Sequence, residues 1–230
     1  MRTSQHEVVF LFDVDNTLLD NDRVVNDLRQ HLKSEFGNES MDRYFAILED
    51  LRAKLGYTDY LGALQLYRLE DLCDPRLLMM SSFLVDYPFA DLLYPGSFDV
   101  LEHVSKWGPT VILSDGDVVF QPRKVQQSGL WKAVDGRVLI YIHKEQMLSD
   151  VERLYPALHY VMVDDKLRIL EAIKKIWGYK VTTVFPRQGH YALEQRNVAA
   201  YPPADITVEC IKDLVNYNLP DFLGSAKKQQ

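Results

Sequence analysis

A chain of 230 residues can bury a substantial apolar core, and a composition of 47% hydrophobic and 26% charged residues is that of a globular protein, not of a disordered or fibrous one. With 33 acidic against 26 basic residues, the formal net charge of −7 argues against a general electrostatic attraction to nucleic acid or anionic membrane. Any anionic substrate therefore needs cations placed locally at its site.

The cysteine content and the absence of long apolar segments bear on the compartment. Cys73 and Cys210 stand far apart and without metal-ligand spacing, so we expect free structural thiols. The first residues contain no apolar signal segment, and no stretch approaches the ~20 apolar residues that span a bilayer. We expect a cytoplasmic protein, a monomer or homodimer, with neither nucleic acid nor membrane as a partner.

Six short β-rich runs alternate with helical patterns, which predicts an α/β fold with a doubly wound, Rossmann-like parallel sheet. The runs are nearly continuously apolar, as expected for strands covered by helices on both faces. Ligands in such sheets bind beyond the carboxyl ends of the strands, so the residues that follow each strand are candidates for the site. The predicted strands are residues 8–12, 110–113, 138–142, 160–163, 181–185 and 206–208.

The long interval between the first two strands has helical periodicity and no convincing strand, which indicates an inserted helical cap. Two helices are expected to end at Gly37 and Gly56, a third to begin near Thr58, and a fourth at Asp74-Pro75, an N-cap residue followed by proline. We expect a helical cap domain over residues 21–91 and an α/β core domain made of residues 1–20 and 92–230.

The clearest chemical signal is an apolar strand that runs directly into two carboxylates and a hydroxyl. The segment reads Asp13-Val14-Asp15-Asn16-Thr17. On its own, a polar turn capped by aspartates would explain it equally well. A function for these residues therefore depends on what the neighbouring strands bring to the same edge.

Three later strands also end in polar residues. Ser114 and Asp115 open a turn that could present N–H groups to an anion, although a helix cap is a common alternative. Lys144 could supply a cation, although a lone lysine is usually solvated. Asp164 and Asp165 would bring the number of acidic groups at one sheet edge to four. Their repulsion requires a divalent cation, and oxygen ligands favour Mg²⁺.

Together these segments resemble the four signature motifs of the haloacid dehalogenase superfamily, in the order Asp-x-Asp-x-Thr, strand-Ser, Lys and strand-Asp-Asp. The resemblance covers about residues 8–189, including a helical cap of the C1 type after the first motif. It implies a Mg²⁺-dependent phosphohydrolase, acting on a small phosphorylated metabolite, a phosphate monoester, through an aspartyl-phosphate intermediate.

The resemblance also implies a role for each matching residue. Asp13 is the nucleophile, Asp15 is the general acid and base, and Lys144 neutralises the phosphoryl group and keeps Asp13 ionised. Ser114 and the backbone N–H groups of Asn16 and Asp115 bind the phosphoryl oxygens. The implied catalytic residues are Asp13, Asp15, Ser114 and Lys144, and the implied phosphate-binding residues are Asp13, Asn16, Ser114, Asp115 and Lys144.

The implied metal ligands are the Asp13 carboxylate, the backbone carbonyl of Asp15, and the pair Asp164 and Asp165, with the direct ligand of this pair left open. Members of the family often carry a further acid a few positions later. Here Lys166, Leu167 and Arg168 follow instead, so the surroundings of the metal differ from the family pattern.

Other functions within the superfamily remain open. The resembling dehalogenases lack an acid at the position of Asp15, which favours phosphoryl chemistry. A sugar phosphomutase needs the same aspartates, and a non-catalytic small-molecule-binding member is the second alternative. The cap loops are expected to select the leaving group, with Arg43, Tyr44, Tyr57, Tyr60 and Arg68 as candidate contacts.

Overall fold

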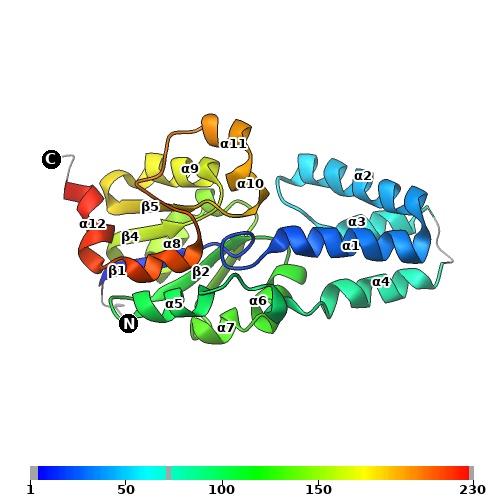
Figure 1. Cartoon of the computed structure of the whole chain (residues 1–230), viewed down its shortest axis with the longest axis horizontal. Coiled ribbons are helices and arrows are strands. Elements are labelled where there is room, and N and C mark those ends of the chain that lie inside the picture. The colour runs from blue at the N-terminus through cyan, green and yellow to red at the C-terminus, as the bar shows by residue number, and fades with distance from the viewer. Residues whose placement is uncertain (1–4, 71–73, 228–230) are drawn as a thin grey trace.

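The computed structural model describes residues 5–70 and 74–227, so Cys73 lies outside the described residues. Its centre is a six-stranded, entirely parallel sheet in the order β3-β2-β1-β4-β5-β6 (Figure 1). This confirms the predicted α/β fold. The strands are β1 (His6–Phe12), β2 (Thr110–Asp115), β3 (Val138–Tyr141), β4 (Ala157–Val163), β5 (Val181–Pro186) and β6 (Ile206–Val208).

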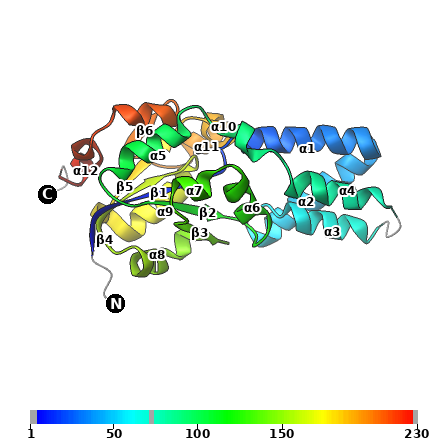
Figure 2. The ribbon, with the colours of Figure 1, turned by 90° about the horizontal axis from the view of Figure 1, so that it is seen from below.

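Helices cover both faces of the sheet, and β1 shows why its sequence is almost wholly apolar. Val8, Phe10 and Phe12 point into one core cluster, whereas Val9 and Leu11 point into the other. Helices α5 and α8 lie on opposite sides of the sheet (Figure 2). The helices of this part are α5 (Ser97–Ser105), α6 (Phe120–Gln127), α7 (Leu130–Ala133), α8 (Leu148–Leu154), α9 (Leu167–Trp177), α10 (Gly189–Leu193), α11 (Gln195–Ala199) and α12 (Leu219–Lys227).

Four helices lie together beyond the carboxyl ends of the strands (Figure 1). We call them the helical module; they are α1 (Asn21–Phe36), α2 (Asn38–Leu55), α3 (Tyr60–Arg68) and α4 (Arg76–Val85). Gly37 and Gly56 end the first two helices with positive φ, as expected. The third begins at Tyr60, slightly later than predicted, because the Asp59 carboxylate accepts the Gly62 N–H.

The fourth helix also begins one residue later than the sequence indicates. It starts at Arg76, and the Asp74 carboxylate accepts the Arg76 N–H at 2.9 Å. The module is packed firmly on the rest of the chain, because the Tyr60 ring lies 5.2 Å from that of Phe120 at the start of α6. Phe89, which follows the module, lies 5.6 Å from the same ring.

The strand order shows at which edge of the sheet the polar residues that follow the strands come together. Chain connections run outward in opposite directions on either side of β1 and β4, which makes a crevice at their carboxyl ends. Phe12 is in register with Val163 of β4 and with Ile112 of β2, so the residues that follow all three strands emerge together. Within the described ranges, no helix has both the length and the apolar character needed to cross a membrane.

Candidate active site and metal centre

A tight loop after β1 holds Asp13 at the crevice. The Asp13 N–H donates to the Val163 carbonyl at 3.0 Å, and the N–H groups of Leu18 and Leu19 both donate to the Val14 carbonyl. Asn16 has a φ of 59°, a left-handed conformation that asparagine tolerates better than most residues. The loop therefore turns back on itself within a few residues, and the Asp13 side chain stays buried.

The loop after β5 supports this turn from the other side. Gly189 has a φ of 74°, and a Cβ atom at its position would lie 2.4 Å from the Asn16 Cβ. The buried Gln188 side chain donates to the Thr17 carbonyl at 2.7 Å and accepts the Ile211 N–H at 2.8 Å. Only a glycine allows this close approach, so the loop after β5 holds the loop after β1 in place by direct contact.

Lys144 is the central cation of the site. Its Nζ lies 2.6 Å from Asp13 Oδ1 and 2.7 Å from Asp164 Oδ2, and all three side chains are buried. Burial alone would raise the pKa of Asp13, but the charges of Lys144 and Lys166 outweigh it and hold that pKa below its usual value. The two lysine charges therefore favour the ionised form of Asp13, which its predicted role as a nucleophile requires.

The Ser114 hydroxyl donates to the same Asp13 oxygen at 3.2 Å and is itself held by the Gln121 side chain at 3.0 Å. Asp115 turns its carboxylate toward the backbone N–H of Lys144, at 2.7 Å. Burial raises the pKa of Asp115 to about 6. The end of β2 thus orients both Asp13 and Lys144.

Three buried carboxylates could hold a cation. Asp13, Asp164 and Asp165 each offer an oxygen, and these atoms lie within 4.8 Å of one another. Asp13 Oδ2 and both carboxylate oxygens of Asp165 have no hydrogen-bond partner among the described residues. Burial raises the pKa of Asp165 well above its usual value, and that of Asp164 is also raised. A divalent cation would compensate both features, and the all-oxygen donor set suits Mg²⁺.

The two adjacent aspartates have different surroundings. Asp164 pairs with Lys144 through one oxygen and accepts the Lys166 N–H through the other, at 2.8 Å. Asp165 keeps both oxygens free of hydrogen bonds, while its N–H donates to the Thr17 hydroxyl at 3.0 Å. Asp165 is therefore the better placed direct ligand, and Thr17 has a positioning role that sequence reasoning did not assign.

Asn16 does not occupy its predicted role in this conformation. Its backbone N–H donates to the Leu19 carbonyl at 2.6 Å, because the left-handed turn directs it there. Its side-chain oxygen accepts the N–H groups of Asn21 and Asp22 at the start of α1. Asn16 thus connects the loop after β1 to the helical module.

Lys124 is a site residue that sequence reasoning missed. It lies in α6 with 1% of its side chain exposed, and its Nζ lies 2.6 Å from Asp15 Oδ1 and 3.0 Å from Asn21 Oδ1. The signal was present, because Lys124 falls on the same buried helical face as Phe120 and Gln121. A buried lysine needs an acidic partner, and here that partner is Asp15.

A cleft of about 530 Å³ lies between the sheet edge and the helical module, and Asp15 and Asp115 line it from the sheet side. Tyr57 and Tyr60 line it from the module, as expected. The predicted contacts Arg43, Tyr44 and Arg68 do not line it. Arg43 is exposed and pairs with Glu70, and Tyr44 is buried in the module, where its hydroxyl donates to the Tyr60 carbonyl.

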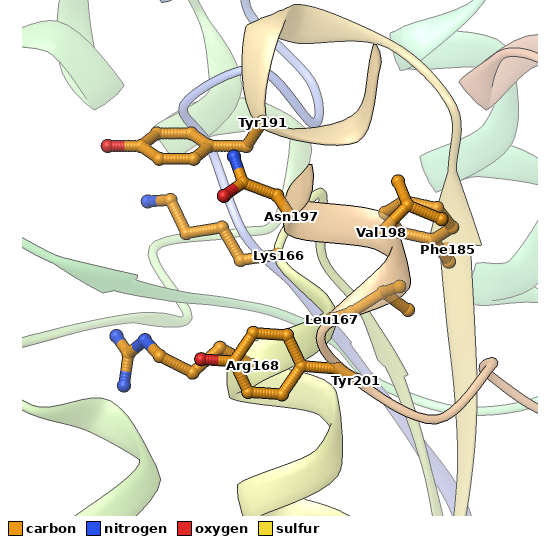
Figure 3. Close-up of a pocket in the computed structure, with 8 residues that line it drawn as sticks. All are labelled: Lys166, Leu167, Arg168, Phe185, Tyr191, Asn197, Val198 and Tyr201. Atoms are coloured by element: carbon orange, nitrogen blue, oxygen red, sulfur yellow. The ribbon is translucent and has the colours of Figure 1, made fainter. Parts of the chain in front are cut away.

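A smaller hollow of about 120 Å³ adjoins the cleft. Figure 3 shows its apolar base, made by Phe185, Val198 and Leu167. Lys166 and Tyr191, which extend away from this base in the same direction, also line the large cleft. The hollow and the cleft therefore share one wall.

Comparison with known proteins agrees with this geometry. A family model described as haloacid dehalogenase-like hydrolase matches residues 8–176. A solved haloacid dehalogenase-like hydrolase from Burkholderia xenovorans is 65% identical, with a TM-score of 0.89, over 93% of this chain and 99% of that chain. A search of curated proteins gives no match.

Two more distant structures share the fold. The HAD-hydrolase YfnB from Bacillus subtilis, bound to magnesium, is 15% identical with a TM-score of 0.60, over 93% of this chain and 98% of that chain. The L-2-haloacid dehalogenase from Xanthobacter autotrophicus, with chloropropionic acid covalently bound, is 18% identical with a TM-score of 0.59, over 92% and 98%.

The metal centre is tested by replacing Asp165, whose two free oxygens make it the best placed ligand. Asp165→Asn should weaken Mg²⁺ binding roughly tenfold or more, as measured by calorimetry. The matched control is Asp117→Asn in the same cleft, where an amide oxygen can still accept the Val119 and Phe120 N–H groups. Equal Mg²⁺ affinity in the wild type and Asp165→Asn would contradict the assignment.

Proposed function

The chain belongs to the haloacid dehalogenase-like hydrolases, and we propose that it is a Mg²⁺-dependent phosphohydrolase that releases phosphate from a small phosphate monoester. The observation that carries the proposal is the group of three buried carboxylates, whose charge exceeds that of the two nearby lysines, Lys144 and Lys166. A bound Mg²⁺ would offset this charge and the charge of a phosphoryl group during transfer.

The rival within the family is cleavage of a carbon–halogen bond, since a dehalogenase is among the proteins of similar fold. Such a reaction transfers no multiply charged group and needs no cation to offset one. Asp15, which lines the cleft two residues after Asp13, supplies an acid and base for an alkoxide leaving group. The magnesium bound to the Bacillus subtilis protein of the same fold also supports the phosphohydrolase.

Asp13 would act through its carboxylate. Oδ1 is engaged by Lys144 and Ser114, whereas Oδ2 has no hydrogen-bond partner among the described residues and is free to reach a substrate or a cation. Attack on phosphorus forms the Asp13–phosphoryl bond and breaks the bond to the leaving oxygen, which takes a proton from Asp15. Asp15 then removes a proton from water as the water attacks phosphorus, and Asp13 and phosphate are released.

Lys124 would position Asp15 between these steps. Its ammonium group donates to the Asp15 carboxylate and to the side-chain oxygen of Asn21, the first residue of the helical module. Proton transfer to the leaving oxygen requires Asp15 to turn from Lys124 toward the substrate. Lys124 therefore couples the acid and base to the position of the module.

The helical module, within residues 21–91, would act as a cap over the residues 1–20 and 92–230 that form the sheet part. It already faces the sheet edge across the cleft, and the hydrogen bonds of Asn16 connect its first helix to the loop after β1. The Bacillus subtilis protein of similar fold shows interdomain movement. Closure of the module would exclude water from Asp13 and confine substrates to small molecules.

The proposal is tested by measuring phosphate release from sugar phosphates, nucleotides and phosphoglycolate, with and without Mg²⁺, alongside halide release from 2-chloropropionate. We expect Mg²⁺-dependent phosphate release that falls on the order of 10⁴-fold or more in Asp13→Asn, because the nucleophile is lost. Asp99→Asn, an exposed residue of α5 outside the cleft, is the control. Halide release without phosphate release would overturn the proposal, and isomerised sugar phosphate would favour a phosphomutase.

Replacing Lys124 tests the positioning of Asp15. Lys124→Met should lower kcat by about 10²-fold, because Asp15 loses the contact that orients it, with the melting temperature as a check on folding. Lys132→Met on α7, an exposed lysine, is the matched control. A well-folded Lys124→Met protein with the kcat of the wild type would rule out this role.

A further inference from the structure

Two arginines of the helical module line the cleft, and the proposed mechanism does not use them. Arg29 of α1 and Arg52 of α2 line the cleft from the module, and Lys166 lines it from the start of α9. We propose that Arg29 and Arg52 bind a second anionic group, a carboxylate or a phosphate, on the leaving part of the substrate. This inference rests on the proposed phosphohydrolase function and names its substrate class.

The two arginines are weakly neutralised within the protein. Arg29 is half-buried and forms no ion pair with any described carboxylate; its guanidinium lies 3.9 Å from the centre of the Phe45 ring. Among the described carboxylates, Arg52 pairs with Glu49 alone, at 3.5 Å, in a solvent-exposed contact along the same helix. Such surface pairs contribute little, so both guanidinium groups can take a better anion.

Apart from Glu49, which makes the exposed pair with Arg52, the acidic residues that line the cleft do not supply that anion, because each is already engaged. Asp15 pairs with Lys124. Asp22 accepts the backbone N–H of His190 at 2.7 Å and the Asn16 side-chain amide at 2.9 Å. The remaining cleft aspartates, Asp115 and Asp117, accept backbone N–H groups of Lys144, Val119 and Phe120.

The Tyr191 ring lies close to a cation of the helical module, Arg52, and to a cation of the sheet part, Lys166. The Arg52 guanidinium lies 5.5 Å from its centre and the Lys166 ammonium 5.1 Å. Lys166 extends beside Tyr191 in Figure 3, and it is also next to the catalytic carboxylates in sequence. Lys166 thus stands between the reacting centre and Arg52, and an anion at the arginines would lie across the cleft from the scissile phosphate.

The chemistry of the arginines defines the ligand. A guanidinium group binds carboxylate and phosphate oxygens in the same two-pronged geometry, so either group fits. A cleft of about 530 Å³ leaves room for a carbon skeleton of sugar size between the two anionic ends. The expected substrate is a phosphate monoester whose leaving group carries a carboxylate or a second phosphate.

The test compares ligands that share a carbon skeleton. Glucose 6-phosphate, 6-phosphogluconate and glucose 1,6-bisphosphate differ in whether the far end is neutral, a carboxylate or a phosphate; glycerol 3-phosphate, 3-phosphoglycerate and glycerol 1,3-bisphosphate repeat the comparison with three carbons. Each is assayed for turnover by the wild type with Mg²⁺ and for binding to Asp13→Asn by calorimetry. At least one doubly anionic ligand should bind about tenfold more tightly than its neutral-ended partner.

Variants of the two arginines test whether they cause the tighter binding of doubly anionic ligands. Arg52→Gln and Arg29→Gln should each reduce the ratio of doubly anionic to neutral-ended affinity, and should raise KM for the doubly anionic substrate more than they lower kcat. Arg43→Gln, on the same helix as Arg52 but paired with Glu70 outside the cleft, should leave the ratio unchanged. The carboxylate and phosphate arms show which anion is preferred.

The outcomes separate this inference from the phosphohydrolase itself. Equal affinity for neutral and doubly anionic ligands in both series, or no binding of any of them, overturns the inference. So does a preference that survives in Arg29→Gln and Arg52→Gln. A preference that depends on the arginines, without turnover of any ester, supports the anion site and overturns the phosphohydrolase alone.

Discussion

The rest of the site depends on the ion pairs of Lys144, whose ammonium group lies between Asp13 and Asp164. Three carboxylates are buried there, and the charges of Lys144 and Lys166 together do not balance them. Burying an uncompensated carboxylate is costly, so the surplus charge must be relieved by protonation or by a cation. Burial raises the pKa of Asp165, which favours the first solution, and Mg²⁺ would supply the second.

The buried charged residues are held in place by contacts from several different strands and loops of the fold. Strands β1, β2 and β4 end in register, so their polar residues meet without long loops. Thr17 holds the Asp165 backbone, and Gln188 and Gly189 hold the loop that contains Thr17. Asn16 and Lys124 extend the same network to the first residues of the helical module. A movement of the module would therefore change the position of the Asp15 side chain.

Much of the fold and the centre of the site could be predicted because they depend on local patterns. Apolar runs mark buried strands, and the carboxyl ends of parallel strands always share one edge, so the sequence could predict that Asp13, Ser114, Lys144 and Asp164 lie close together. The catalytic roles given to them come from the family resemblance and stay predictions. The direction of the Asn16 N–H, which donates to the Leu19 carbonyl, could not be predicted because the sequence does not specify the left-handed turn.

Only some of the residues with which the helical module lines the cleft could be predicted, Tyr57 and Tyr60 among them, and the reason is geometric. Arg43 and Arg52 both lie on α2, but at about 100° per residue they fall on opposite faces of the helix. The sequence does not say which polar face looks toward the sheet, so Arg43 was chosen and Arg52 was missed. Lys124 was missed likewise, because its role depends on α6 packing beside a loop more than a hundred residues earlier in the chain.

The most direct test of the account is the pH dependence of Mg²⁺ binding to the wild-type protein by calorimetry. Burial raises the pKa of Asp164 and Asp165, so at low pH protons compete with the cation for these carboxylates, and binding must release them. The account predicts that Mg²⁺ affinity rises from pH 5 to pH 8 and that the binding heat changes with the ionisation enthalpy of the buffer. No binding, or an affinity independent of pH, would contradict it.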